Sequence, residues 1–290
     1  MSKITLSDVT YLYGEGTPFL KTALDHVNLA IEGDAVTGLI GHTGCGKSTL
    51  VQLLNGLLKP TEGTVCLDGQ DIWAQPKEIG KVRFRVGLVF QYPEYQLFEE
   101  TVYKDIAFGP RNMGLDESEV DRRVRSAAAF VSLDESLLSQ SPFDLSGGQK
   151  RRVAIAGVIA MEPEVLILDE PAAGLDPIGR KVIFGGVTAY QKEKHATVLI
   201  VSHSMEDMAR YADQLIVMKS GKILMTGDCH TVFSQTAKLR DAGLNVPQIT
   251  SFMEELSGKG LPVRTDIFTV EQAKDELLRL LKEGGKRHAE

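Results

Sequence analysis

The chain has 290 residues, of which 43% are hydrophobic and 24% charged, the composition of a globular protein with a sizeable core. Its formal net charge of -7 argues against the broad basic face that nucleic-acid-binding proteins use, so nucleic acid is not an expected partner. The three widely spaced cysteines indicate neither a disulfide framework nor a zinc site, and no apolar run approaches the ~20 residues that span a bilayer, so work at a membrane would require a separate anchor.

The first predicted elements are two strands, over residues 4–13 and 24–31. Apolar and polar residues alternate in both, which is typical of antiparallel strands with one solvated face. Residues 36–40 form a short apolar run that predicts a buried strand, and residues 47–58 have a helical pattern. A strand, a glycine-rich loop and a helix in this order form a βα unit.

The middle of the chain alternates further strands and helices. Buried strands are predicted at residues 86–90, 165–168 and 197–201, and helices at residues 102–113, 117–131, 148–161 and 178–192. This order predicts a mostly parallel sheet with helices on both faces. After residue 227 the pattern weakens until a last amphipathic helix at residues 270–282, so residues 228–290 are interpreted as a small C-terminal module.

Residues 41–49, GHTGCGKST, match the phosphate-binding pattern GxxxxGK(S/T) and lie between an apolar strand and a helix, as that motif requires. Glycines let backbone N–H groups approach phosphate oxygens, and the following helix directs its positive end at the same anion. We expect Lys47 to reach the β- and γ-phosphates and the Ser48 hydroxyl to bind Mg²⁺. A glycine-rich turn without a ligand is the alternative. The predicted nucleotide-binding residues of this phosphate loop are Gly41, His42, Thr43, Gly44, Cys45, Gly46, Lys47, Ser48 and Thr49.

A second motif, VLILDE at residues 165–170, is a predicted buried strand that ends in two carboxylates. Ligands bind at this end of the strands in open α/β sheets. We expect Asp169 to hold the Mg²⁺ shell and Glu170 to orient or deprotonate the attacking water. Taken alone, the pattern also fits a strand that runs into a polar turn, so its weight comes from its combination with the phosphate loop.

A third motif, LSGGQ at residues 145–149, stands at the start of a predicted helix. Ser146 is a good N-cap, and Gly147 and Gly148 expose the first helical N–H groups, so this end also suits an anion. A plain capped helix is the alternative. Because one nucleotide hardly needs two such sites from one chain, we expect this LSGGQ tip (residues 146–149) to cover ATP bound by a neighbouring subunit.

Together these motifs resemble the nucleotide-binding domain of ATP-binding cassette (ABC) transporters, over roughly residues 3–227. The resemblance implies an α/β P-loop NTPase fold with a mostly parallel core sheet, an antiparallel β subdomain and a helical subdomain over about residues 91–148. It divides the chain into a nucleotide-binding domain, residues 1–227, and a C-terminal extension, residues 228–290. It also implies that ATP and Mg²⁺ are bound in a head-to-tail dimer, between the phosphate loop of one subunit and the LSGGQ of the other.

The resemblance assigns roles to three more residues. Gln91 resembles the loop glutamine that contacts Mg²⁺ and water and senses the membrane partner. Asp176 resembles the aspartate at the dimer seam, and His203 the switch histidine that donates to the γ-phosphate, which is electrostatic assistance. The predicted catalytic residues are thus Glu170, His203 and Gln91; the predicted metal ligands are Ser48, Gln91 and Asp169; and the predicted nucleotide contacts of the second half-site are Ser146, Gly147, Gly148, Gln149 and Asp176.

Adenine is expected to stack on an aromatic side chain of the first strand. Tyr13 resembles the family's stacking aromatic, and we select it. Tyr11 lies on the same face of the strand and is the alternative, and either side chain also suits a place in the core.

The stretch FQYPEYQLFEETV at residues 90–102, followed by DIAFGP, is similar to the A-component ATPases of energy-coupling factor (ECF) vitamin transporters, in the form of the second (A′) subunit. The C-terminal extension fits that group, with dimerisation as a candidate role. The resemblance implies a motor that couples ATP-driven dimer closure to uptake of vitamins or other micronutrients. It places the chain as a peripheral subunit at the cytoplasmic face of the cell membrane.

The implied partners are a paralogous ATPase subunit, an integral membrane coupling subunit and a substrate-binding membrane component, which binds the solute in place of this chain. A cobalt or nickel importer ATPase is the nearest alternative. A soluble ABC ATPase without a transport role is disfavoured, because it would need a coiled-coil insertion or a second cassette.

Two local features lead to further expectations. Glu94, Glu99 and Glu100 follow Gln91 and predict an acidic, aromatic-lined groove for a basic coupling helix of the membrane subunit. A solvated acidic helix start is the alternative. Cys45 stands where the family usually has serine, so alkylation of its thiol is expected to block ATP binding, provided that the loop is accessible.

Overall fold

The computed structural model describes residues 3–287, with side chains up to residue 282. One of its two sheets is antiparallel, with strand order β2-β1-β4-β5. Strands β1 (Ile4–Tyr13) and β2 (Lys21–Ile31) pair with each other, and β4 (Glu62–Leu67) connects β1 to β5 (Gln70–Asp71). The two predicted N-terminal strands and their antiparallel character are therefore confirmed.

The second sheet has six strands in the order β10-β9-β3-β8-β7-β6 and is parallel except at one edge. Only β10 runs antiparallel to its neighbour. The strands are β3 (Val36–Gly41), β6 (Val86–Val89), β7 (Val165–Asp169), β8 (Thr197–Val201), β9 (Gln214–Lys219) and β10 (Lys222–Asp228). Because β3 and β7 are parallel, the phosphate loop and the VLILDE carboxylates leave the sheet at the same edge.

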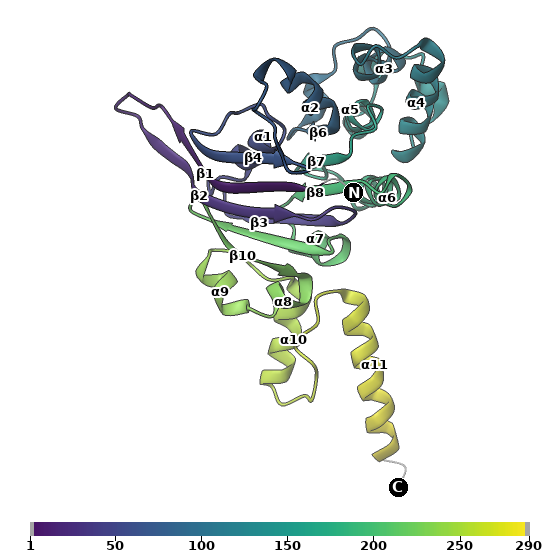
Figure 1. Cartoon of the computed structure of the whole chain (residues 1–290). Helices are drawn as coiled ribbons and strands as arrows, with labels where there is room; N and C mark the ends of the chain where they lie inside the picture. Colours follow the sequence, from purple (N-terminus) through teal and green to yellow (C-terminus); the bar gives the residue numbers. More distant parts are fainter. Residues whose placement is uncertain (1–2, 288–290) are drawn as a thin grey trace.

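Helices cover the six-stranded sheet, and α3, α4 and α5 pack on one another at one end of the molecule (Figure 1). The helices of the main body are α1 (Lys47–Leu54), α2 (Ile79–Arg85), α3 (Val102–Asn112), α4 (Glu117–Phe130), α5 (Gly147–Ile159), α6 (Pro177–Lys194) and α7 (Met205–Tyr211). Short 3₁₀ turns lie at Pro76–Glu78, Pro93–Gln96, Glu135–Leu137 and Pro142–Asp144.

Helix α1 ends four residues before the predicted end at residue 58. Gly56 has φ 72°, and its N–H donates to Leu53 O while Leu57 N–H donates to Gln52 O. These paired hydrogen bonds around a left-handed glycine form a Schellman cap, which ends a helix even where apolar periodicity continues.

The core lies on both faces of the six-stranded sheet. Along β7, Leu166 and Leu168 pack toward the helices, whereas Ile167 packs toward the antiparallel sheet and α1. Successive side chains of a strand point to opposite faces, so an unbroken apolar run such as VLIL is what a strand covered on both sides requires.

The C-terminal part contains α8 (Cys229–Phe233), α9 (Thr236–Asp241), α10 (Gln248–Gly258) and α11 (Val270–Arg287). Side chains up to Val246, and Phe268 beyond them, belong to the main hydrophobic cluster, whereas Met253, Val263, Ile267 and Ala273 form a small cluster of their own. Helix α11 extends away from the body toward the C-terminus (Figure 1). The boundary at residue 227 stays a prediction; the packing of apolar side chains changes about twenty residues later.

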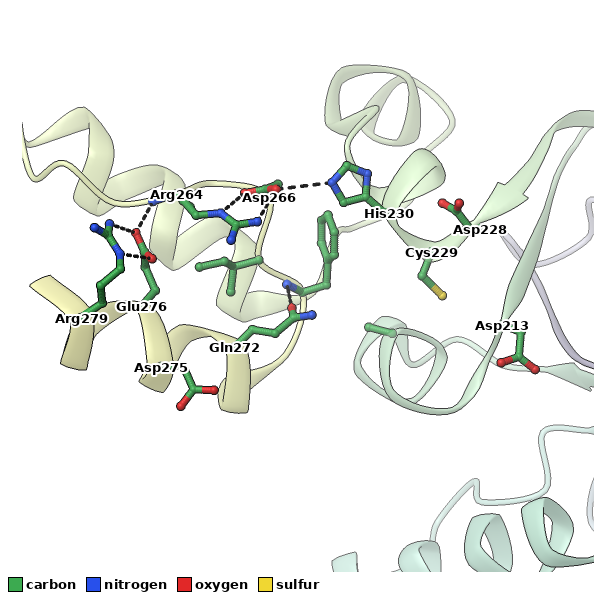
Figure 2. A pocket seen from close by; sticks show the side chains of 13 residues that line it. Asp213, Asp228, Cys229, His230, Arg264, Asp266, Gln272, Asp275, Glu276 and Arg279 are labelled. Atoms are coloured by element: carbon green, nitrogen blue, oxygen red, sulfur yellow. Dashed lines mark hydrogen bonds and ion pairs between the residues drawn. The ribbon is translucent and has the colours of Figure 1, made fainter. Parts of the chain in front are cut away.

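A cavity of about 640 Å³ lies at the seam between α8 and α11. Figure 2 shows that Asp266 bridges it, because its carboxylate accepts from Arg264 at 2.7 Å and lies 3.4 Å from His230 Nε2. Arg279 pairs with Glu276 at 2.8 Å on the far side. Although this cavity is larger than those around the motifs, none of the predicted site residues lines it.

Candidate nucleotide-binding site

The phosphate loop connects β3 to α1 and is shaped by glycines. Gly46 has φ 109°, and a Cβ there would lie 2.7 Å from Ala23 O, so no other residue fits. Lys47 is buried, and its Nζ donates to Gly41 O at 2.7 Å and His42 O at 3.0 Å. The lysine ammonium therefore lies inside the curve of the loop, where a phosphate would be held.

One cavity of about 300 Å³ brings together predicted residues from five separate segments of the chain. Those that line it are Tyr13, Thr43, Gly44, Gly46, Lys47, Ser48, Thr49, Gln91, Asp169, Glu170 and His203. Gly41, His42 and Cys45 of the loop do not line it. Lys21 and Ala23 do, although they were not predicted; Lys21 is paired with Tyr13 across the β1–β2 ladder, and only strand register could have identified it.

Two adjacent carboxylates at the end of β7 share this cavity. The Ser48 hydroxyl donates to Asp169 Oδ2 at 3.4 Å, and burial raises the pKa of Asp169 above its usual value. Burial, and then the neighbouring Asp169, raise the pKa of Glu170 to about 7. Glu170 Oε1 is buried and has no hydrogen-bond partner among the described residues. Such a pair of desolvated carboxylates favours a nearby cation or proton donor.

The oxygen atoms of Ser48 and Asp169 fit Mg²⁺ in chemistry and spacing. Magnesium uses one or two protein oxygens and completes its shell with water and phosphate. In the part of the chain that the structure describes, no group of three or more His, Cys, Asp or Glu side chains could hold a metal unaided. Magnesium binding at Ser48 and Asp169 thus stays a prediction that the donor set supports.

His203 follows β8 and faces Glu170, with 3.5 Å between Nε2 and Glu170 Oε1. Partial burial and then Lys47 lower the pKa of His203, so its ring is neutral at pH 7. Glu170 itself has φ 51°, a left-handed conformation that non-glycine residues adopt mainly where the surroundings impose it, often at functional sites.

Of the two candidate tyrosines, only Tyr13 reaches the cavity. Its ring is 41% exposed, and its hydroxyl lies 3.2 Å from Thr49 Oγ1. Tyr11 packs against the core and supports Tyr13 edge-on, with ring centroids 4.9 Å apart. The placement favours Tyr13 for stacking on adenine.

The LSGGQ tip lies at a second cavity of about 430 Å³, which shares no lining residue with the first. Ser146, Gly148, Gln149 and Asp176 line it. Ser146 and Gln149 form a capping box, in which Ser146 N–H donates to Gln149 Oε1 at 2.9 Å and Gln149 N–H donates to Ser146 Oγ at 3.4 Å. Within one chain, the phosphate loop and the LSGGQ tip therefore line separate cavities.

The prediction that Glu94 lines an acidic docking groove is wrong. Both carboxylate oxygens of Glu94 accept from Arg151, at 2.9 and 2.7 Å, and the Arg151 side chain is 4% exposed. Although burial raises the pKa of Glu94, its hydrogen bonds with Arg151 hold that pKa below its usual value. Glu100 is paired with Lys104. Glu94 thus has a structural role: it connects the 3₁₀ turn Pro93–Gln96 to Arg151 of α5.

Alkylation of Cys45 was expected to block ATP binding only if the loop is accessible, and the Cys45 thiol is not accessible. Cys45 is 1% exposed, and its Sγ fills the space beside Gly41, where a Cβ would lie 2.5 Å away. Burial raises the pKa of its thiol, and Lys47 offsets this only in part. A buried thiol with a raised pKa is inert, so alkylation of the folded protein is not expected.

Comparison with known proteins agrees with this geometry. A family model described as ABC transporter matches residues 24–173. The energy-coupling factor transporter ATP-binding protein EcfA2 of Clostridium acetobutylicum is 54% identical over 96% of this chain and 98% of its own length. Its counterpart of the same name in Caldanaerobacter subterraneus subsp. tengcongensis is 51% identical over 96% of this chain and 98% of its own length.

Solved structures of ABC transporter proteins are also similar to this chain. CbiO1 from Clostridium perfringens, part of the ABC transporter complex cbiONQ, has a TM-score of 0.74 at 41% identity over 87% of this chain and 98% of its own. The dimeric bacterial ABC transporter cassette MJ0796 has a TM-score of 0.70 at 29% identity over 78% of this chain and 98% of its own. Among the described residues, no helix combines the length and the apolar character needed to cross a membrane. The chain belongs to the ABC transporter family, as an ATP-binding, ATP-hydrolysing component of an energy-coupling factor transporter.

Proposed function

We propose that the chain binds Mg·ATP in the cavity of its phosphate loop and hydrolyses it when the LSGGQ tip of a second, paralogous ATPase subunit covers the nucleotide. The observation that carries this proposal is the separation of the phosphate loop and the LSGGQ tip into two cavities without a common residue. A head-to-tail pair of subunits would complete both. Tight closure would then require ATP, because its γ-phosphate would be bound from both sides.

Residues of this chain would divide the chemistry among them. Ser48 and Asp169, with Gln91 at the cavity, would hold Mg²⁺, which when bound neutralises charge on the phosphates. Lys47 would turn from the loop carbonyls to the β- and γ-phosphates. Glu170 Oε1, which has no hydrogen-bond partner among the described residues, would accept a proton from the attacking water, and the neutral His203 ring would donate to a γ-phosphate oxygen.

The membrane partner would be an integral coupling subunit, with a separate membrane component binding the solute. Exposed aromatic side chains support a docking surface near Gln91: Tyr95 is 84% exposed, and Tyr92, Phe98 and Phe108 are also exposed. Vitamins or related micronutrients are the proposed solutes, because the similar proteins belong to energy-coupling factor transporters. The chain would thus act as a peripheral subunit at the cytoplasmic face of the membrane.

A cobalt or nickel importer ATPase is the second candidate, favoured by the likeness to a part of the cbiONQ complex. The integral subunits that accompany the chain decide between the two candidates. Purification from membranes through a tag on this chain, followed by identification of those subunits, makes the choice.

The variant Glu170→Gln tests the composite site, because glutamine keeps the size of the side chain and removes the base. With its paralogue and Mg·ATP, we expect this variant to form a stable nucleotide-bound dimer while phosphate release falls about 10²–10³-fold. Dimerisation is measured by size-exclusion chromatography with and without ATP. Ordinary turnover in the variant, or no ATP-dependent pairing, contradicts the proposal; Glu100→Gln, at an exposed ion pair, is the matched control.

A further inference from the structure

The residues between β8 and the first turn of α7 (202–207, here the switch segment) connect three parts of the molecule. On one side, His203 faces Glu170 in the nucleotide cavity. On another, Asp207 is the ion-pair partner of Arg180 at 3.2 Å, and Arg180 belongs to α6, the helix that Asp176 caps. The switch segment is therefore held against both predicted half-sites.

The third contact joins the switch segment to the C-terminal part of the chain. Glu206 Oε1 accepts from the backbone N–H of Gln248 at 3.1 Å, and Gln248 is the first residue of α10. Helix α10 has Pro247 as its N-cap, no side-chain cap and no acidic residue in its first turn. Glu206 thus supplies, from another element, the acceptor that this helix start lacks.

The surroundings of this hydrogen bond also connect the two regions. A cavity of about 420 Å³ is lined by His203, Met205 and Glu206 from the switch segment and by Val246 and Gln248 from the C-terminal part. His203 lines this cavity as well as the nucleotide cavity. Met205 and Val246 are both buried in the main hydrophobic cluster, so the seam is packed on its inner side.

We propose that Glu206 is a positioning residue for ATP hydrolysis: it ties α10 to the switch segment and so sets the position of His203 relative to the γ-phosphate. Only two residues separate His203 from Glu206, and Met205 between them is buried, so the segment has little freedom to change shape between these two side chains. The inference rests on the proposed function, because it takes His203 as the γ-phosphate contact. By reciprocity, nucleotide binding changes how firmly the start of α10 is held.

The hydrogen bond can be removed from either end with a matched control. Glu206→Ala deletes the acceptor, whereas Glu206→Gln keeps a carbonyl oxygen in its place. Gln248→Pro deletes only the donor, because proline suits the first helical position and the preceding residue, at φ -50° and ψ 137°, has the extended backbone that precedes proline. Gln248→Ala keeps the N–H and controls for loss of the side chain.

The variants are compared as full-length chains assembled with the paralogue and the membrane subunits. We expect Glu206→Ala and Gln248→Pro each to lower kcat about fivefold or more, the low end of couplings between sites, and to change KM for ATP by a smaller factor, because the nucleotide and the start of α10 are linked. Glu206→Gln restores kcat, and Gln248→Ala has the kcat of the unmodified chain. The double variant Glu206→Ala/Gln248→Pro is no slower than either single one, because both remove the same bond.

Hydrogen exchange at the first amides of α10 provides a readout apart from activity. In the unmodified chain, a non-hydrolysable ATP analogue alters the exchange of these amides; in Glu206→Ala the analogue has no effect on them. The inference is overturned if kcat is unchanged in both Glu206→Ala and Gln248→Pro, or if the losses of kcat add up in the double variant. It is also overturned if the nucleotide analogue does not change hydrogen exchange in the unmodified chain. If Glu206→Ala does not fold, the comparison of Gln248→Pro with Gln248→Ala decides the test.

His203→Ala separates a failure of this inference from a failure of the proposed function. If His203→Ala hydrolyses ATP at the ordinary rate, the role assigned to His203 is wrong and this inference fails with it, whereas the composite ATP site is decided by Glu170→Gln. If His203→Ala is inactive while Glu206→Ala and Gln248→Pro turn over normally, the proposed function stands and only the link to α10 is wrong.

Discussion

The phosphate loop and the LSGGQ tip, the two predicted half-sites of one chain, differ in how their polar groups are satisfied. Around the loop, Glu170 keeps a buried oxygen that has no hydrogen bond within residues 3–282, and Lys47 donates to carbonyls of its own loop. At the tip, Ser146 and Gln149 satisfy each other. A site that holds uncompensated buried charge requires a ligand to reach its lowest free energy, whereas a capped helix end is stable alone. We therefore expect the loop to bind nucleotide before the tip of a second subunit covers it.

The largest effect is expected from loss of the Glu94–Arg151 pair. Arg151 belongs to α5, the helix that begins at the LSGGQ tip, and the pair connects this helix to the turn after Gln91. Glu94→Lys places a cation beside a buried guanidinium, and we expect the free energy of unfolding to fall by about 3–5 kcal/mol. Urea denaturation followed by circular dichroism measures the change. Glu100→Lys, at an exposed pair with Lys104, is the control and is expected to leave the free energy of unfolding almost unchanged. A loss below 1 kcal/mol for Glu94→Lys would show that the pair does not support α5.

Removal of the loop ammonium tests whether the loop binds first. Lys47→Ala leaves the β- and γ-phosphates without their cation, and we expect affinity for ATP to fall about 10²-fold or more, the scale of one well-placed charged contact. Binding of a fluorescent ATP analogue to the isolated full-length chain measures it. Lys21→Ala, at the exposed rim of the same cavity, is the control and is expected to lose less than about tenfold. Equal losses in both variants would argue that net charge, not the loop geometry, binds the nucleotide.

The raised pKa of Glu170 predicts that the free energy of unfolding of the chain without ligand depends on pH. Glu170 has a pKa of about 7 in the folded state, against an ordinary 4.5, so the folded chain holds this proton more tightly than the unfolded chain does. The resulting stabilisation is present below pH 4.5 and is lost as pH rises to 7. Without Mg²⁺ and nucleotide, Glu170→Gln should therefore be more stable than the unmodified chain by about 1–3 kcal/mol above pH 7, and similar to it at pH 4.5.

Thermal unfolding of both proteins at several pH values measures this difference. Addition of Mg·ATP should reduce the advantage of Glu170→Gln, because the bound cation then stabilises the carboxylate. A stability difference that does not vary with pH would mean that Glu170 is not desolvated in solution.

The tip should respond more weakly than the loop. Ser146→Ala removes the N-cap oxygen of α5, and we expect a loss of about 1 kcal/mol in stability with unchanged binding of ATP to the isolated chain. Hydrolysis with the paralogue should fall further than stability alone explains, because the tip would then contact the partner's nucleotide poorly. Ser146→Thr keeps a capping oxygen and serves as the control. A loss of ATP binding in the isolated Ser146→Ala chain would contradict the separation of the half-sites.

Much of this fold can be predicted from local patterns. Runs such as VLIL predict a strand covered on both faces, and the three motifs lie at strand ends or helix starts whose position follows from the parallel sheet. Strands β4, β5, β9 and β10 were not predicted, and α1 ends early because its Schellman cap depends on one glycine conformation. Local periodicity therefore identifies the core strands better than the ends of the elements.

The parts of the site that escaped prediction depend on contacts between distant residues. Glu94 and Arg151 are 57 positions apart, and nothing in the composition of either segment indicates their ion pair. Lys21 reaches the cavity through the register of β1 and β2, which the alternation of apolar residues leaves undetermined. The accessibility of Cys45 likewise depends on how closely the loop packs against Gly41.

The Arg151 guanidinium also has a mechanical consequence. It joins Glu94, in the turn after Gln91, to the carbonyl of Ala173, which follows the β7 carboxylates, while its own helix carries the LSGGQ tip. The Arg151 guanidinium thus connects three segments. If one of them moved relative to the others, a buried charge would lose its partner. A membrane subunit that moved residues 91–96 would therefore also move α5 and the LSGGQ tip, because the Glu94–Arg151 pair connects them without a flexible segment.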